Sequence, residues 1–257
     1  LTNKVLGTDL YEPYEHESAS IPMENKVINK FINFFKEHTR NQKLSYSNYK
    51  KHIKSTAESE VFIPQDILIN KIDIKKVKNY KFKKYGAHNL KDLRKKFDLI
   101  YCKGIEHIPD WKLTVDNIAS VTKKNSFVYL KTRPFYSYLG PHRYATSAIP
   151  WGHAILTDKE YVRYANQFHK NRAKQMIKSY FNTVTYPRYT IDQLIRLFEM
   201  SNFSLVCKKI ETPHYLNKIL LFKNQIKDFD QLVKRKTQAT PSELSSSVQH
   251  LVFQKIS

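Results

Sequence analysis

Residues 97–111 read FDLIYCKGIEHIPDW, and the fold class follows from this stretch. Residues 97–102 form a short apolar run, as strands buried within a parallel sheet do. From residue 110 to 122 the apolar side chains recur at helical spacing, and residues 126–132 (SFVYLKT) give a second strand pattern. A strand, a helix and a strand in this order predict a parallel sheet covered by helices.

The alternation of helices and strands continues toward the C-terminus. Thr157 and Thr190 each precede a helical pattern and suit an N-cap position. The sequence predicts an aromatic loop over residues 134–157, and the stretch 218–247 is mixed and basic. Helices are expected at residues 158–169 and 190–200, and strands at residues 202–207 and 250–256.

The pattern before residue 97 is less regular. Residues 4–10 (KVLGTDL) have the pattern of a short strand that ends in an acidic residue, Asp9. Residues 78–85 predict another strand, and residues 25–38 have helical spacing. Two strands with a long polar stretch between them extend the α/β pattern toward the N-terminus.

Composition indicates a globular protein. The chain has 257 residues, of which 41% are hydrophobic, so it can bury a core of its own. It contains no apolar run of about 18 residues, the length that spans a bilayer. Cys102 and Cys207 have neither the spacing of metal ligands nor that of a disulfide framework, so we expect two reduced core cysteines in a cytoplasmic protein, with no metal.

The formal net charge of +21 permits a second interpretation. Lysines are spread through nearly every segment and are densest at residues 71–84 and 91–96. A solvated lysine face explains these runs as well as a phosphate-binding stripe does. Since no zinc-finger or RNP-like motif accompanies them, nucleic-acid binding remains the alternative prediction.

Several segments, in order, resemble motifs of the class I S-adenosylmethionine-dependent methyltransferases. Residues 97–100 followed by IEHIPDW (105–111) resemble the fourth strand and its loop, which reads EH(I/V)PD in many small-molecule methyltransferases. Residues 126–130 resemble the fifth strand, with Asn125 at a turn where the family has glycine. Residues 5–9 resemble the second strand, and residues 189–203 a later helix with its exit turn.

The resemblance implies a Rossmann-like α/β sheet, mostly parallel with an antiparallel C-terminal strand. It implies one methyltransferase-like domain over residues 1–257, with an inserted helical segment at about 15–75. The family carries a glycine-rich cofactor loop after its first strand, and the five glycines of this chain are too far apart to form it. Because that strand is central, its loss would leave two buried edges unpaired. We therefore expect an N-terminally truncated domain whose first strand and loop lie upstream.

The resemblance also implies a cofactor site at the carboxyl ends of the strands, where open α/β sheets bind ligands. Asp9 would accept hydrogen bonds from the ribose hydroxyls, although a solvent-facing turn aspartate is the alternative. His88 and Asn89 stand where the family often has an acidic residue facing the adenine. Glu106 and His107 could instead be a capping pair without chemistry. The expected cofactor-binding residues are Asp9, Leu10, His88, Asn89, Cys102, Lys103, Glu106 and His107.

In the family, the segment after the fifth strand faces the transferred methyl group. His142 and His153 are the candidate catalytic bases, because imidazole titrates near neutral pH. The alternative is that both histidines brace the loop through backbone hydrogen bonds, and that the aromatic residues beside them only pack. The expected substrate-binding residues are Arg133, Tyr136, Arg143 and Trp151, the two arginines as partners for an acidic group.

The sequence therefore predicts methyl transfer from S-adenosylmethionine to a small-molecule substrate, away from any membrane. Two alternatives stay open: a basic protein that binds or methylates nucleic acid, and a non-catalytic methyltransferase-like protein whose cofactor site has decayed.

Overall fold

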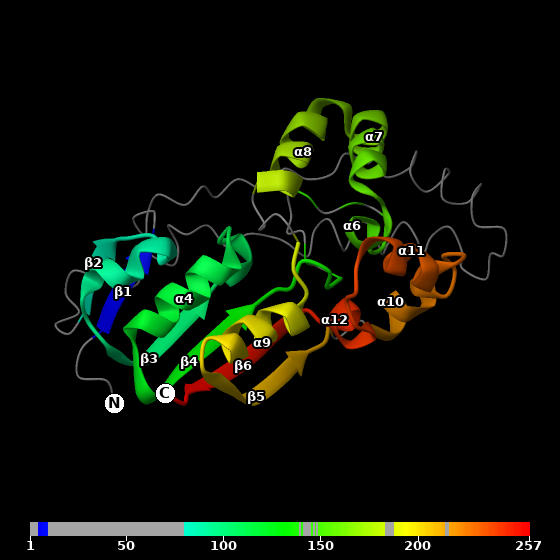
Figure 1. The fold of residues 1–257 in the computed structure, drawn as a ribbon. Coiled ribbons are helices and arrows are strands. Elements are labelled where there is room, and N and C mark those ends of the chain that lie inside the picture. Colours follow the sequence, from blue (N-terminus) through cyan, green and yellow to red (C-terminus); the bar gives the residue numbers. More distant parts are fainter. Residues whose placement is uncertain are drawn as a thin grey trace.

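The computed structural model describes residues 5–9, 80–138, 140, 145, 147, 149–182, 188–213 and 216–257. The inserted segment and the helix expected at residues 25–38 lie outside these residues. Two parallel strands, β1 (Val5–Asp9) and β2 (Tyr80–Lys84), form one sheet. A second sheet has the order β3 (Phe97–Lys103), β4 (Thr122–Thr132), β6 (Val248–Lys255), β5 (Phe203–Glu211), as Figure 1 shows.

The strand directions confirm the fold class. β3 and β4 are parallel, and β6 is antiparallel to both of its neighbours, β4 and β5. β5 therefore runs in the direction of β3 and β4, and only the C-terminal strand is reversed. This is the mostly parallel sheet that the sequence predicts.

Helices α4 (Trp111–Val121) and α9 (Ile191–Met200) cover one face of the four-stranded sheet (Figure 1). α4 begins at Asp110, whose side chain accepts a hydrogen bond from the backbone N of Leu113 at 3.0 Å. α9 begins with a capping box in which Thr190 and Gln193 satisfy each other's backbone N–H groups, as expected for Thr190. Apolar side chains of both helices and of the strands form the sheet core: Ile105, Trp111, Val115, Ile118, Val128, Leu130, Ile191, Leu194, Phe198, Phe203, Leu251 and Phe253.

The opposite face of this sheet carries exposed apolar side chains. Leu99 and Tyr101 of β3 are 51% and 54% exposed, and Leu99 lies in register with the partly exposed Phe127 of β4. Cys207 of β5 is also exposed, so the prediction of a core cysteine is wrong there. β5 is an edge strand with an irregularity between Leu205 and Cys207, which brings Cys207 into register with Val252 of β6, outside the sheet core. Cys102 is half-buried, and neither cysteine forms a disulfide.

A group of helices lies beyond the ends of β4 and β5, and we call it the cap (Figure 1). The prediction of a loop over 134–157 is wrong at residues 152–155, which form a short helix, and the mixed stretch 218–247 also contains cap helices. The apolar patterns of these stretches are short, and their helices are stabilised by packing in the cap core. The cap helices are α6 (Gly152–Ile155), α7 (Asp158–His169), the 3-10 turn η4 (Lys170–Arg172), α8 (Ala173–Asn182), α10 (Leu216–Lys223), α11 (Phe229–Lys236) and α12 (Pro241–Ser245).

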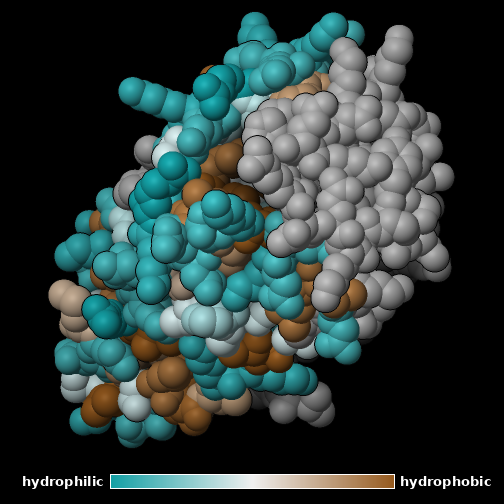
Figure 2. All heavy atoms as spheres, turned by 90° about the vertical axis from the view of Figure 1, so that its right-hand side faces the viewer, coloured by the Kyte–Doolittle hydropathy of each residue, from teal (hydrophilic) through white to brown (hydrophobic). Residues whose placement is uncertain are grey.

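The cap has a hydrophobic core of its own, separate from the sheet core. Tyr161 and Tyr180 stack at its centre with ring centroids 3.8 Å apart. Thr157 caps α7 in a capping box with Glu160, as the sequence predicts. Figure 2 looks at the molecule from the cap side, where hydrophilic side chains surround smaller hydrophobic patches. Among the described residues, no helix is long and apolar enough to cross a membrane.

Candidate functional site

The loop after β3 is fixed at the carboxyl edge of the sheet by Glu106. Its side chain is 6% exposed. One carboxylate oxygen accepts a hydrogen bond from Thr132 Oγ1 at 2.7 Å, and the other accepts one from the backbone N of Arg133 at 3.1 Å. Because both donors belong to the end of β4, Glu106 joins the loops that follow two neighbouring parallel strands. Its geometry is that of a residue that shapes the loop.

Gly104 permits the turn between β3 and this loop. Its φ is +103°, a value that side-chain-bearing residues rarely adopt, and an added Cβ would lie 3.4 Å from Cδ2 of His107. Lys103 and His107 are exposed on either side of it, and Cys102 is half-buried. The backbone N of Gly104 donates to the carbonyl O of Lys131 at 3.4 Å, and its carbonyl O accepts from the backbone N of His107 at 2.9 Å, so Gly104 forms the turn that leads from β3 into this loop.

His88 and Asn89 lie in the 3-10 helix η2 (Ala87–Leu93), which follows β2. His88 Nε2 hydrogen-bonds to the carbonyl O of Pro109, just before α4, and Asn89 is exposed. η2 thereby brings the loop after β2 to the loop after β3. Asp9 is the last residue of β1 and lies in register with Lys84 of β2. Its side chain, like Leu10, is outside what the structure describes.

The segment after β4 runs into the cap, and its predicted site residues are buried there. His153 is 2% exposed, and its Nε2 donates to the carbonyl O of Ser137 at 2.8 Å. Burial lowers the pKa of His153 to about 3, so its imidazole is neutral at physiological pH and a weak base. These contacts favour the bracing alternative for His153. His142 and Arg143 lie outside the described residues.

The two predicted aromatic residues also belong to the cap core. Trp151 is 2% exposed, donates from Nε1 to the carbonyl O of Leu244 at 2.8 Å, and packs edge-on against Tyr138. Tyr136 is 4% exposed, and burial raises the pKa of its phenol to about 12 despite a side-chain hydrogen bond with Thr237. Their contacts are those of packing residues at the base of the cap.

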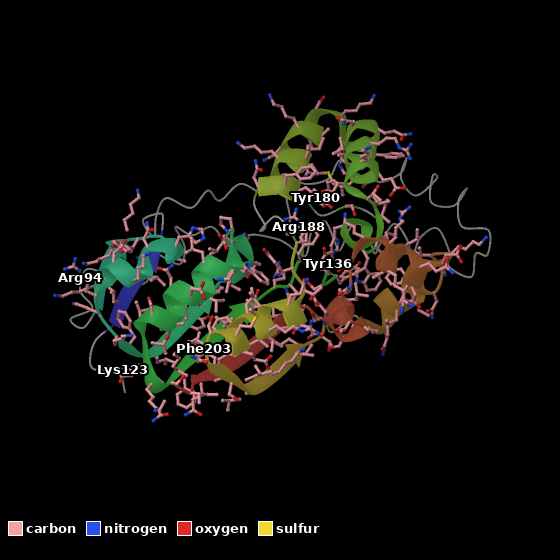
Figure 3. All side chains as sticks on the ribbon, viewed as in Figure 1. Arg94, Lys123, Tyr136, Tyr180, Arg188 and Phe203 are labelled. Carbon is pink, nitrogen blue, oxygen red and sulfur yellow. The ribbon has the colours of Figure 1, made fainter. Side chains whose placement is uncertain are left out.

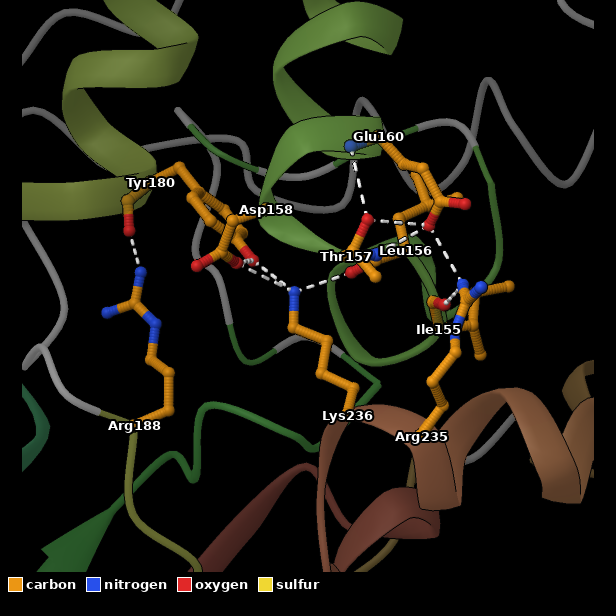
Figure 4. Close-up of polar contacts among 9 residues, drawn as sticks. All are labelled: Ile155, Leu156, Thr157, Asp158, Glu160, Tyr180, Arg188, Arg235 and Lys236. Atoms are coloured by element: carbon orange, nitrogen blue, oxygen red, sulfur yellow. Dashed lines mark hydrogen bonds and ion pairs between the residues drawn. The ribbon is translucent and has the colours of Figure 1, made fainter.

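A polar cluster that sequence reasoning missed joins α11 to the start of α7 (Figure 4). The Nζ of Lys236 donates to the carbonyl O of Leu156, to Asp158 Oδ1 and to Tyr180 Oη, at 2.5, 3.0 and 2.5 Å. We call Asp158, Tyr180 and Lys236 the clasp. Burial lowers the pKa of Lys236 by more than the neighbouring Asp158 carboxylate raises it. A second ion pair beside it joins Arg235 to Glu160 at 2.8 Å.

Arg188 lies between the clasp and the carboxyl edge of the sheet. Its guanidinium donates to the backbone O of Tyr180 and lies 4.0 Å from the ring centroid of Phe135. Figure 3 shows Tyr136, Tyr180 and Arg188 close together where the sheet meets the cap. Of these three residues the sequence predicts a site role only for Tyr136, because Tyr180 and Arg188 lie in separate segments without a motif.

No protein-family model and no curated protein matches the chain. Solved structures do resemble it at low similarity. A methyltransferase candidate from Galdieria sulphuraria has 12% identity and a TM-score of 0.36, over 74% of this chain and 64% of that one. A cyclopropane synthase from Mycobacterium tuberculosis has 12% identity and a TM-score of 0.38, over 79% and 68%. A coclaurine N-methyltransferase bound to N-methylheliamine and SAH has 10% identity and a TM-score of 0.37, over 88% and 72%.

The chain thus spans somewhat less than two thirds of the Galdieria structure. At these scores the comparison adds little to the strand pairing itself. The fold is instead defined by the chain's own strand pairing. β3 and β4 are parallel, the reversed C-terminal strand β6 lies between β4 and β5, and helices cover one face of the sheet. Together these features give the mostly parallel α/β sheet with a reversed C-terminal strand that the sequence predicts.

Proposed function

We propose that the protein transfers a methyl group from S-adenosylmethionine to a small-molecule acceptor. The observation that carries this proposal is the carboxyl edge of β3 and β4. There Glu106 joins the two loops, Gly104 forms the turn after β3 at a positive φ, and the cap stands beyond the strand ends. In a parallel sheet this edge is where ligands bind.

In this proposal the cofactor would be held by groups at this edge. Asp9 would bind the ribose hydroxyls, and His88 and Asn89 the adenine. The backbone from Cys102 to His107 would line the sulfonium end, with Glu106 holding that backbone in place. When bound, the cofactor supplies an electrophilic methyl group on sulfur.

A glycine-rich loop belongs beside these residues in the family. Among the described strands, β1–β2 and β3–β4–β6–β5 form two separate sheets. A further strand between β1 and β3 would join them and present such a loop at the carboxyl edge. This arrangement is part of the proposal.

The acceptor would lie between the sheet edge and the cap. Alignment of the acceptor atom with the sulfonium carbon would supply most of the rate, since positioning alone can contribute several kcal/mol, roughly 7–11 at best. His142 is our preferred base. His153 would act through the shape of the loop, because its ring is buried and bonded to the backbone. Arg133 and Arg143 would hold an acidic group of the substrate.

Isothermal titration of S-adenosylmethionine and S-adenosylhomocysteine tests the proposal. The titrations are run on this chain, on a chain extended by its upstream coding sequence, and on the Gly104→Ala variant of whichever binds. Micromolar binding that Gly104→Ala weakens at least tenfold, with a Glu199→Gln surface control unchanged, supports the site. If neither chain binds either compound, the proposal fails, and the nucleic-acid alternative is tested next by salt-dependent binding of oligonucleotides.

A further inference from the structure

The short helix α12 connects the two hydrophobic cores of the molecule. Leu244 packs in the cap core, and its carbonyl O accepts the hydrogen bond from Trp151 Nε1. The preceding residue, Glu243, is directed to the sheet core instead. Its Oε2 accepts a hydrogen bond from the backbone N of Ile191, the first residue of α9, at 3.1 Å. Two adjacent residues of α12 thus hold the cap on one side and the sheet on the other.

Glu243 and Gln249 place two unmatched acceptors in this junction. Glu243 is 2% exposed and Gln249 of β6 is fully buried. Within the described part of the chain, Glu243 Oε1 and Gln249 Oε1 have no hydrogen-bond partner. Gln249 Nε2 donates to Ser246 Oγ at 3.3 Å, and Ser246 Oγ donates to the backbone carbonyl O of Glu243 at 2.7 Å, so hydrogen bonds through Ser246 connect the two residues. A proton on Glu243 would turn an acceptor into a donor there.

The charged and titratable groups around Glu243 come from three elements. Asp192 of α9 disfavours a negative charge on Glu243, and Lys208 of β5 favours one. These two form an ion pair with each other at 3.5 Å, which reduces the net effect of both on Glu243. Tyr136, after β4, is also close enough for the Glu243 charge to raise the pKa of its phenol. Burial is the largest influence, and it raises the pKa of Glu243 to about 7.

We propose that Glu243 is a proton-dependent joint: as a neutral acid it holds α12 between α9 and the cap, and its ionisation loosens the cap over the carboxyl edge of the sheet. An ionised carboxylate in this position has one oxygen without a donor and sits in a buried junction. Such a charge favours any movement that admits water. Since α12 also holds Trp151, that movement changes the surroundings of Trp151. The proposal needs neither cofactor nor substrate, and it stands apart from the methyl-transfer proposal.

The chain contains two tryptophans, one in each core, and they report separately. The whole protein is labelled with 5-fluorotryptophan, and its ¹⁹F spectrum is recorded from pH 5.5 to 8.5. We expect the Trp151 resonance to titrate with a midpoint near pH 7, while Trp111 in the sheet core stays constant. Glu243→Gln, neutral at every pH and nearly the same shape, should abolish the Trp151 titration. Glu199→Gln, an exposed substitution with the same charge change, should leave it intact.

A stability measurement checks the same proposal by a second route. The unfolded-state pKa of glutamate is near 4.3, below the native value, so the native state holds the Glu243 proton more tightly. The contribution of Glu243 to stability is therefore fully present below about pH 4.3 and is lost as pH rises toward 7. Because the buried histidines give the opposite slope, the comparison with Glu243→Gln is what isolates this contribution. Relative to Glu243→Gln, the unfolding constant of the wild type should rise up to about tenfold per pH unit in that window.

Parallel stability curves for wild type and Glu243→Gln would overturn the proposal. So would a Trp151 titration that persists in Glu243→Gln. If that variant does not fold, the wild-type spectrum decides alone, because a Trp151 resonance that stays constant from pH 5.5 to 8.5 excludes the joint.

Discussion

Replacing Lys236 by methionine should loosen the cap more than any comparable change on its surface. The side chain of Lys236 is 9% exposed and donates three hydrogen bonds. Methionine fills most of the same volume but donates none of them. The carbonyl O of Leu156 then loses this donor, and Asp158 loses its ion partner.

The loss of unfolding free energy depends on whether each of the three acceptors finds another donor or water in the variant. Tyr180 Oη keeps its own hydrogen bond to Asp158 Oδ1 at 2.8 Å. The Asp158 side chain is 37% exposed, so water can solvate part of its charge. A buried acceptor left without a donor costs about 1–3 kcal/mol. With the partial loss at Asp158, we expect about 2–3 kcal/mol of unfolding free energy, near the lower end of values for broken buried ion pairs.

Urea denaturation followed by circular dichroism measures this loss, and thermal unfolding should show a melting temperature lower by about 4–12 °C. Lys234→Met is the matched control, since Lys234 is exposed on the same helix and should cost less than about 0.5 kcal/mol. Adding Asp158→Asn to Lys236→Met should restore part of the loss. If Lys236→Met is as stable as Lys234→Met, the clasp does not hold the cap and our reasoning is refuted.

Three further outcomes are expected. Gly104→Ala should destabilise the protein by about 1–2 kcal/mol in chemical denaturation, because alanine is strained at a φ of +103°, whereas Gly140 and Gly152 have ordinary φ values. Glu106→Gln should weaken S-adenosylhomocysteine binding, measured by calorimetry, more than it lowers stability. The amide keeps one acceptor but loses the charge-assisted bonds to Thr132 and Arg133. Equal affinity would show that the loop does not depend on Glu106. The contribution of the buried histidines to stability should fall as pH drops from about 6.5 toward 3. Burial lowers the pKa of His153 to about 3 and that of His169 to about 4, so the unfolded chain takes up protons first. His153→Gln should flatten this pH profile, and an unchanged slope would contradict the lowered pKa of His153.

Local chemistry explains which parts of the fold the sequence predicts. Residues 97–132 were predicted as a strand, a helix and a strand, because burial on both sides of a parallel strand leaves a continuous apolar run. Thr157 and Thr190 were predicted as caps, because a capping box needs only residues three positions apart. The reversed direction of β6 came from the family resemblance, since no periodicity encodes strand direction.

The parts that were missed depend on contacts between distant residues. Lys236 meets Asp158 across 78 positions, so neither residue is unusual in its own segment. Helix α11 has only a short apolar pattern, and its buried face is defined by Phe229 and Val233 packing in the cap core. His153 illustrates the same limit at the site. Its residue type suggests a base, but the carbonyl of Ser137, 16 positions away, and the surrounding core decide its ionisation.

The exposed side of β3 also governs how the purified protein behaves in solution. β3 ends the four-stranded sheet, with no neighbour on its outer side among the described strands, and it shows Leu99 and Tyr101 to solvent. Free strand edges with apolar side chains tend to pair between molecules. Lys96 and Lys103 flank this edge in a chain of formal net charge +21, so electrostatic repulsion opposes that pairing at low salt. Because the screening length shortens to about 3 Å at 1 M ionic strength, we expect concentrated salt to weaken this protection, so the protein should be kept in buffer of low ionic strength.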